Sequence, residues 1–188
     1  QMIKVKDAET TFVMKIFSLT LLIYCLFFTL IVAPASGRWV VDQTGEKIEL
    51  PSEPTRVLAL APSLAEMIFS LQAEEKLVGA TSYSNFPEAA KKLPRVGSYV
   101  QLDLEKIVAM KPDLCIAIKD GNPLRTVDAI QALGIPVFAI DPRSIDQITD
   151  AFLLVGDLLG ASKRANELVS EMKHRLALVK KRVDSSKA

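Results

Sequence analysis

The sequence predicts an α/β fold, a Rossmann-like doubly wound parallel sheet of about four strands. Short apolar runs without alternation, typical of strands covered on both faces, recur at 56–61, 77–80, 114–118 and 137–140. Segments with helical periodicity lie between these runs, joined by short turns, which implies right-handed strand–helix–strand crossovers. A β-hairpin precedes this pattern, and a long polar helix follows it.

The hairpin is predicted from alternation. Trp39 to Leu50 alternates apolar and polar residues around the turn Gln43-Thr44-Gly45, and a proline-rich lead follows at 51–54. The first buried strand, Arg56 to Ala61, then ends at Pro62. This strand and the helix after it organise the domain, because the later elements repeat their order.

The first helix is expected to begin at Ser63, with Ser63 as its N-cap and Glu66 completing a capping box. One face of this helix is apolar and predicts the buried side: Leu64, Met67, Ile68 and Leu71. The free backbone N–H groups at its start then lie at the carboxyl end of a strand, where open α/β sheets bind ligands.

The middle of the domain follows the same plan. A polar, aromatic loop at 81–87 and a single helical turn at 88–92 follow the second strand, and another loop spans 93–99. A helix from Asp103 to Met110 is predicted next, capped by Asp103. Its inward side chains are expected to be Leu104, Ile107 and Val108.

Three further helices complete the prediction. Asn122-Pro123 opens one that ends at Gly134, and another runs from Ser144 to Leu159 before Gly160. The last, Ser162 to Val183, consists of about 22 strong helix formers and is roughly 33 Å long, which is too long to flank a single lobe.

The first 37 residues are assigned to an N-terminal extension and an export signal. Ile16 to Val32 is almost wholly apolar, follows Lys15 and precedes small residues, so cleavage is expected after Ala35 or Gly37. The mature chain is then periplasmic or otherwise extracytoplasmic. An uncleaved membrane anchor is the alternative, because the apolar block approaches the length of a membrane span. Lipidation at Cys25 is not favoured, since Tyr24 precedes it.

Composition excludes several classes of function. The formal charge of +1 gives no surplus of basic residues for a nucleic-acid partner. Removal of the signal would leave Cys115 as the single cysteine, within an apolar run, so we predict no intramolecular disulfide and a small buried side chain. His174 is the only histidine and is assigned to the surface. The sequence therefore predicts no metal site and no cofactor.

An ordered set of residues extends through nearly all of 40–183 and carries a family resemblance. It includes Asp42, Gly45, Leu50-Pro51, Arg56-Val57, Pro62-Ser63, Glu66, Val78-Gly79, Ser82-Tyr83, Val96-Gly97, Leu104-Glu105, Lys111-Pro112-Asp113-Leu114 and Gly134-Ile135-Pro136-Val137. With this set the chain resembles the N-terminal lobe of the periplasmic binding proteins that serve importers of cobalamin, haem and iron-siderophores. Two lobes joined by one rigid long helix characterise that class.

The resemblance implies an organisation and a function. Residues 38–160 would form the N-terminal ligand-binding lobe, 161–188 the interlobe helix with a truncated end, and the second lobe would be missing from this chain. Ser82 to Pro87 and Leu104 to Val108 are most similar to cobalamin-binding proteins. The implied function is to bind cobalamin or a related corrinoid and deliver it to the membrane permease of an ABC importer.

The same resemblance and the strand-end positions suggest the site residues. Direct ligand contacts are predicted for Pro62, Ser63, Tyr83, Ser84, Tyr99, Lys119, Gly121 and Asn122. The aromatic side chains would stack on a planar apolar ligand. The resemblance makes Glu105 the acidic residue that docks onto arginines of the permease.

Two alternatives to cobalamin binding stay open. Where cobalamin-binding relatives often have tryptophans, this chain has Tyr99 and Ile118, so haem or an iron-siderophore is the first alternative ligand. The second alternative is a small exported α/β hydrolase that uses Ser63. Serine hydrolysis needs a general base, however, and a single distant histidine without a Gly-x-Ser-x-Gly turn argues against it.

Overall fold

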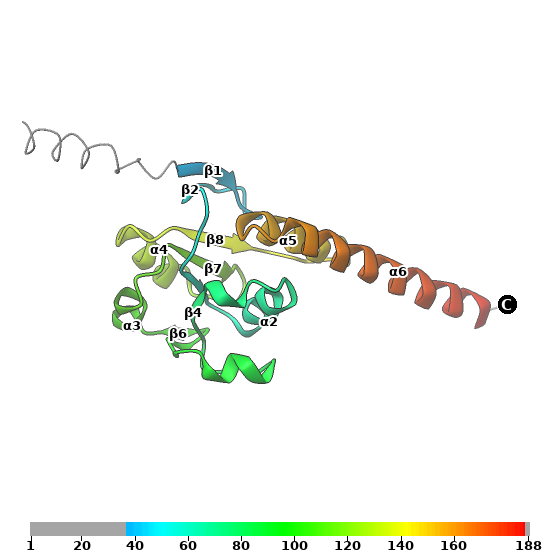
Figure 1. Ribbon diagram of the computed structural model, residues 1–188, viewed down its shortest axis with the longest axis horizontal. Coiled ribbons are helices and arrows are strands. Elements are labelled where there is room, and N and C mark those ends of the chain that lie inside the picture. The colour runs from blue at the N-terminus through cyan, green and yellow to red at the C-terminus, as the bar shows by residue number, and fades with distance from the viewer. Residues whose placement is uncertain (1–36, 187–188) are drawn as a thin grey trace, which may run out of the picture. The chain divides into compact units, whose positions relative to one another are not determined.

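The computed structural model describes residues 37–186, and its centre is a four-stranded parallel sheet with strand order β4-β3-β7-β8 (Figure 1). The strands are β3 (Val57–Ala59), β4 (Leu77–Ala80), β7 (Leu114–Ile118) and β8 (Val137–Ile140). The last three match the predicted strands residue for residue. The first is shorter than the predicted 56–61, although the N–H of Leu60 still donates to the carbonyl of Ile116.

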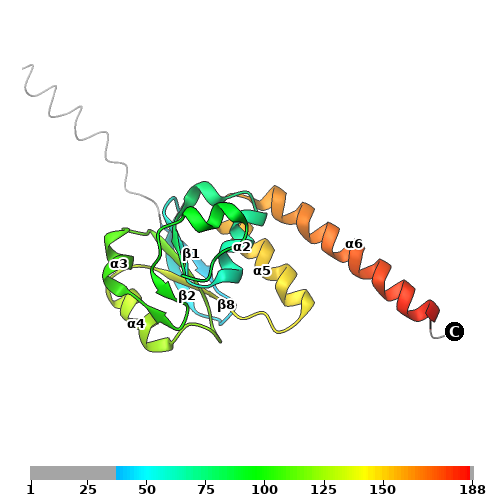
Figure 2. The same ribbon diagram turned by 90° about the horizontal axis from the view of Figure 1, so that it is seen from below.

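Helices cover both faces of this sheet. On one face pack α2 (Pro62–Ser70) and α5 (Ile145–Leu158), and on the other α3 (Leu104–Ala109) and α4 (Leu124–Ala132) (Figure 2). Strand residues alternate between the two cores: Val57 and Ala59 belong to the first, and Leu58 to the second. Because both faces are buried, the strands are apolar throughout, as the doubly wound prediction requires.

The predicted hairpin is confirmed as β1 (Gly37–Val41) and β2 (Lys47–Pro51). Asp42 attaches it to the edge of the sheet. The Asp42 carboxylate accepts hydrogen bonds from the N–H groups of Thr44, Glu46 and Ala139, so one buried acid closes the hairpin turn and joins it to β8. The hairpin thereby covers an edge strand that would otherwise offer unpaired backbone groups.

Short elements connect the larger ones. The predicted turn of helix is confirmed as the 3₁₀ segment η2 (Glu88–Lys92), and a second 3₁₀ segment, η1 (Glu74–Lys76), precedes β4. A small antiparallel pair, β5 (Gly97–Ser98) and β6 (Gln101–Leu102), lies in a stretch predicted as loop. Two residues per strand carry no periodicity for sequence analysis to detect.

The helix caps separate correct predictions from wrong ones. The predicted cap Asp103 is confirmed: it caps α3 and accepts from the N–H of Lys106. Ser144 was predicted as the first residue of its helix, but α5 begins at Ile145, and Ser144 caps it by accepting from the N–H of Gln147. The predicted cap at Ser63 is wrong. Ala61 occupies the cap position of α2, with no side-chain cap bond, and Pro62 is the first helical residue, so Ser63 lies inside the first turn.

The predicted inward face of α2 is confirmed, because Leu64, Met67, Ile68 and Leu71 are all buried. For α3 the prediction holds in part: Ile107 is fully buried and Leu104 packs against it, whereas Val108 is exposed. A helix of six residues has room for only a narrow inward stripe, and Val108 falls outside it.

The long terminal helix is confirmed as α6 (Ser162–Ser186), which extends beyond the layered part of the domain in both views (Figures 1 and 2). Its first turns are buried, with Ala165 and Val169 in the core. Further along, the apolar residues Leu176 and Val179 are exposed. Within residues 37–186, no helix combines the length and apolar character that crossing a membrane requires.

Two predictions on single residues are confirmed. Cys115 is a buried free cysteine in β7, and burial raises the pKa of its thiol to about 12, so it is protonated at neutral pH. His174 lies exposed on α6. The predictions for the export signal at 16–32, its cleavage and Cys25 concern residues outside the described range.

Candidate ligand-binding site

The candidate site lies where β3 and β7, neighbours in the sheet, end. The helix after β3 packs on one face of the sheet, and the helix after β7 packs on the other. Connections that leave adjacent strands toward opposite faces open a crevice at their carboxyl ends, and such switch points are where open α/β sheets bind ligands.

A tight loop after β4 presents Tyr83. Thr81 and Ser84 are buried, and their hydroxyl oxygens lie 3.0 Å apart in a hydrogen bond. Arg95 donates from one Nη1 atom to the carbonyls of Thr81 (2.8 Å) and Ser84 (3.0 Å). The polar groups of the loop therefore point inward, and the ring of Tyr83 remains outside, 64% exposed.

The turn between β5 and β6 presents the second aromatic residue, Tyr99, which is 39% exposed. Gly97 precedes it with a φ of 93°, and the close approach of Gln101 leaves no room for a side chain there. The N–H of Ser82 donates to the carbonyl of Gly97 at 2.8 Å. This bond joins the turn to the Tyr83 loop, so the two tyrosines stand on connected segments.

A third segment, the turn at 118–122 after β7, completes the site. The side chain of Asn122 is buried and bonds to the backbone of Leu60, Tyr99 and Ile118. Gly121 lies beside Tyr99: a Cβ atom added at Gly121 would be 3.5 Å from the ring of Tyr99. This turn therefore contacts both the end of β3 and the turn that carries Tyr99.

Four charged side chains lie beside these segments. Lys119 pairs with Asp141 at 3.3 Å, and Arg143 pairs with Asp141 at 2.6 Å and also with Asp120. The pKa of Asp141 lies below its ordinary value, chiefly because its carboxylate accepts a hydrogen bond from Arg143 and also one from Lys119, against opposing desolvation. Two cations and two carboxylates give this group, which we call the rim cluster, no net charge.

The predicted site residues thus differ in what they offer a ligand. Tyr83, Tyr99, Ser63 and Lys119 are exposed, and Pro62 and Gly121 are partly so. The side chains of Ser84 and Asn122 are buried and already hydrogen-bonded, which argues against their predicted direct contact with ligand. Their polarity indicated function, but their burial depends on neighbours far away in the sequence.

Three important side chains were not identified by sequence analysis: Arg95, Asp141 and Arg143. Asp141 directly follows β8, so its place after a buried strand was a usable signal. Arg95 carried no such signal, because it lies in a predicted loop and bonds backbone carbonyls more than ten residues upstream. Between residues 37 and 186, no cluster of three or more histidine, cysteine or acidic residues could hold a metal ion.

The predicted docking residue, Glu105, is exposed in the first turn of α3. An acidic residue there is favoured by the partial positive charge at a helix N-terminus. Its neighbour Asp103 has a lowered pKa, mainly because its carboxylate accepts a backbone hydrogen bond from Lys106. The carboxylate of Glu105 is therefore presented on the surface of a well-capped helix.

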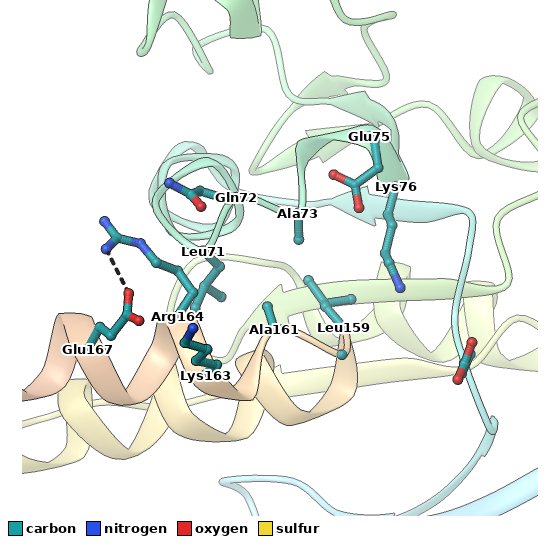
Figure 3. Close-up of a pocket in the computed structure, with 12 residues that line it drawn as sticks. Leu71, Gln72, Ala73, Glu75, Lys76, Leu159, Ala161, Lys163, Arg164 and Glu167 are labelled. Carbon is teal, nitrogen blue, oxygen red and sulfur yellow. Dashed lines mark hydrogen bonds and ion pairs between the residues drawn. The ribbon is translucent and has the colours of Figure 1, made fainter.

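A cavity lies elsewhere, between the end of α2 and the start of α6 (Figure 3). This cavity of about 550 Å³ adjoins the loop that enters β4, so it is at the amino ends of the strands. Acidic and basic side chains contribute equally to its lining: Glu53, Glu75 and Glu167, and Lys76, Lys163 and Arg164. None of the predicted ligand contacts lines it.

A doubly wound sheet with exposed aromatic residues at its switch point is the architecture of a ligand-binding α/β lobe. A family model described as periplasmic binding protein matches residues 57–188. The chain therefore belongs to the periplasmic binding protein family.

Individual relatives are consistent with this assignment. The chain is 45% identical over 102 residues to the vitamin B12-binding protein of Yersinia pestis (strain Pestoides F), an alignment that covers 54% of this chain and 36% of that protein. The vitamin B12-binding protein of the same name from Yersinia pseudotuberculosis serotype O:3 matches equally well. The chain thus spans little more than a third of the length of these relatives.

Solved structures are similar too. The periplasmic vitamin B12-binding protein of Vibrio cholerae superposes with a TM-score of 0.65 at 27% identity, covering 70% of this chain and 52% of that one. A periplasmic haem-binding protein from Pseudomonas aeruginosa gives a TM-score of 0.67 at 27% identity, covering 71% and 48%. In both cases the chain corresponds to about half of the solved protein.

Proposed function

We propose that this chain is the N-terminal lobe of an extracytoplasmic solute-binding protein, which binds cobalamin or a related corrinoid and delivers it to the membrane permease of an ABC importer. The observation that carries the proposal is the pair of exposed tyrosines, Tyr83 and Tyr99, on hydrogen-bonded loops at the switch point. Aromatic rings held in this way suit a large planar ligand with an apolar face.

The rim cluster bears on the choice of ligand. Its two cations are already paired with Asp120 and Asp141. An anionic ligand, such as haem with two propionates or a carboxylate siderophore, would have to compete with these carboxylates for the same cations. A corrinoid, whose periphery is rich in neutral amides, does not need a free positive charge. The rim therefore favours a corrinoid, in agreement with the 45% identity to a vitamin B12-binding protein.

Haem or an iron-siderophore is the first alternative. The similarity to a haem-binding protein of known structure, at 27% identity, supports it as strongly as the similarity to the Vibrio cholerae protein of the same identity. The hydrolase alternative has less support. Ser63 is exposed, but the chain's one histidine lies on α6, and the named relatives are binding proteins.

The proposal includes location and partners. The mature chain is periplasmic after cleavage of the predicted signal near Ala35 or Gly37, or held at the membrane if that segment is retained. A second lobe would cover the opposite face of the ligand. Deep ligand sites bury about 70 to 90% of the ligand surface, and one lobe with Tyr83 and Tyr99 covers roughly one face.

Isothermal titration calorimetry with cyanocobalamin tests this function. The 188-residue chain should bind with a dissociation constant of tens of micromolar, which corresponds to about −6 kcal/mol, half of a nanomolar binding free energy. A version extended by a second lobe should bind at submicromolar concentration. Equal submicromolar affinity of both proteins would contradict an incomplete site. An extended protein that binds haem and ignores cyanocobalamin would establish the first alternative instead.

Docking is assigned to Glu105. Reversing its charge with Glu105→Lys should weaken association with the permease while ligand affinity stays nearly unchanged, because charges at the edge of an interface mainly guide encounter and register. Surface plasmon resonance with the detergent-solubilised permease measures the first quantity, and calorimetry the second. A matched control is Glu88→Lys, since Glu88 is an exposed acid at the start of another helix. An equal loss of ligand affinity with Glu105→Lys would show that the docking role is wrong.

A further inference from the structure

Asn122 is the buried polar residue at the centre of the candidate site. It follows β7, and 94% of its surface is excluded from solvent, since its exposed fraction is 6%. An asparagine amide has two N–H donors and one carbonyl acceptor. All three functions of the Asn122 side chain are engaged with the protein itself.

The partners of Asn122 come from three separate segments. Its Nδ2 donates to the carbonyl of Leu60 at 2.7 Å and to the carbonyl of Tyr99 at 2.9 Å. Its Oδ1 accepts from the N–H of Ile118 at 2.8 Å. One side chain thus joins the ends of β3 and β7 to the turn that carries Tyr99.

The neighbouring residue, Gly121, lies beside the ring of Tyr99 rather than its backbone. A Cβ atom at Gly121 would lie 3.5 and 3.8 Å from two ring carbons of Tyr99 and only 2.7 Å from the side chain of Ile118. The ring therefore has room beside Gly121 that a larger residue would take away. The 118–122 turn holds Tyr99 at two places, its carbonyl through Asn122 and its ring against Gly121.

We propose that Asn122 is a positioning residue, which fixes the orientation of Tyr99 at the switch point without contacting the ligand. The effect on ligand affinity rests on the proposed function, whereas the effect on Tyr99 itself does not. The reason is geometric: the turn between β5 and β6 has only two residues per strand, so its own hydrogen bonds hold it weakly. The bond from Asn122 attaches it to the sheet.

Fluorine NMR of the full chain labelled with 3-fluorotyrosine tests the proposal without a ligand. The chain has three tyrosines, Tyr24, Tyr83 and Tyr99, so the signals can be assigned with Tyr→Phe variants. Asn122→Ala should shift or broaden the Tyr99 signal and leave the Tyr83 signal in place. Thr81→Val is the matched control, because it removes a buried hydrogen bond from the Tyr83 loop and should affect the Tyr83 signal instead.

A conservative variant separates the effect of the two hydrogen bonds that Asn122 donates from the effect of its packing, because aspartate has nearly the same size and shape as asparagine. Asn122→Asp keeps the acceptor for Ile118 but presents a carboxylate oxygen to the carbonyls of Leu60 and Tyr99. It should therefore disturb the Tyr99 signal at least as much as Asn122→Ala does. If Asn122→Ala fails to fold, Asn122→Asp gives the same readout. A Tyr99 signal that is unchanged in the folded variants would overturn the proposal, and so would equal changes at Tyr83 and Tyr99.

A double-mutant cycle with cyanocobalamin tests the step to binding. In the native background Asn122→Ala should weaken affinity about tenfold, and in the Tyr99→Ala background it should have almost no further effect. Equal losses in both backgrounds would mean that Asn122 contacts the ligand directly and would overturn the positioning role. If the native chain binds no cyanocobalamin, the proposed function fails, and the fluorine spectra still decide whether Asn122 positions Tyr99.

Discussion

The two ends of the parallel sheet differ in the side chains that they expose. At the carboxyl end, the side chains of Ser84 and Asn122 are turned inward and hydrogen-bonded, the charges of the rim cluster are paired, and the rings of Tyr83 and Tyr99 are left exposed. At the amino end, six charged side chains and several apolar ones, among them Leu71 and Leu159, line the cavity together, and no aromatic residue within 37–186 does (Figure 3). Arg164 donates to the carbonyl of Ser70 and pairs with Glu167, and Lys76 donates to the carbonyl of Pro54.

This contrast distinguishes a ligand-binding surface at the carboxyl end from a structural contact at the amino end, where α2, α5 and α6 meet. We call this contact the joint. A ligand site exposes apolar or aromatic groups that its framework holds in place. The amino-end cavity lies where α5 turns into α6, and its cations satisfy helix-end and loop carbonyls. Its volume of about 550 Å³ is therefore a poor guide to function. The four predictions below test the distinction and its physical basis.

The largest effect is expected at the aromatic residues. Tyr83→Ala and Tyr99→Ala should each weaken cyanocobalamin binding about tenfold, equivalent to 1.4 kcal/mol, and the double variant should abolish measurable binding. Calorimetry measures the affinities, and circular dichroism checks folding. At the other end of the sheet, Lys163→Ala and Arg164→Ala should leave the affinity unchanged. If these two variants weaken binding as much as the tyrosine variants do, the ligand binds in the amino-end cavity.

An intermediate effect, on stability alone, is expected at the joint. Gly156 in α5 lies so close to α6 that an added Cβ would be 2.4 Å from the Cβ of Ala165, which is fully buried. Gly156→Ala must push the helices apart, so the free energy of unfolding should fall by about 1 to 3 kcal/mol in urea titrations.

The control for this prediction moves the methyl group from one helix to the other. In the double variant Gly156→Ala, Ala165→Gly, the clash is gone, and stability should recover to about the native value, because the glycine removed from α5 offsets the glycine introduced into α6. Failure to recover would mean that crowding between α5 and α6 is not the cause. Ligand affinity at the carboxyl end should be the same in every variant that folds.

The smallest effect is expected in the rim cluster. Asp141→Asn removes the carboxylate that pairs with Lys119 and leaves Arg143 paired with Asp120, so the local charge rises by one. Binding of an anion such as haemin should strengthen about two- to fivefold at low salt, as for exposed ion pairs, and this gain should vanish in 0.5 M NaCl. Cyanocobalamin affinity should not change. Glu167→Gln makes the same charge change at the amino end and should leave haemin binding unaffected.

The pH dependence of the rim follows from the lowered pKa of Asp141. A carboxyl group whose pKa is lower in the folded than in the unfolded protein adds stability above its unfolded pKa, and this contribution is lost as the pH falls through its folded pKa. Between pH 5 and 8 the Asp141 carboxylate stays ionised, so the rim cluster should keep its net charge of zero. Titration of Asp141 should therefore cause no change in the haemin affinity of the native chain over this pH range. A haemin affinity that rises below pH 6 only when Asp141 is present would contradict this.

Much of the fold could be predicted because its signals are local. The strands at 77–80, 114–118 and 137–140 are short apolar runs bounded by turn residues, and burial on both faces leaves no alternation to obscure them. Asp103 was recognised as a cap because a cap bonds a backbone N–H only three residues away. The prediction of Ser63 as the cap of α2 was wrong, because Pro62 already occupies the first helical position and Ser63 is the second helical residue.

The site could be predicted only in part. The sequence by itself determined which residues follow the carboxyl ends of the strands, and so it identified Tyr83, Tyr99, Lys119 and Asn122 as candidates. Only the tertiary structure decided that the amide of Asn122 faces inward to Leu60 and Tyr99, because those partners lie 62 and 23 residues away in the chain. Whether a polar side chain meets solvent or a buried carbonyl depends on which distant segment packs against it, and no local pattern records that.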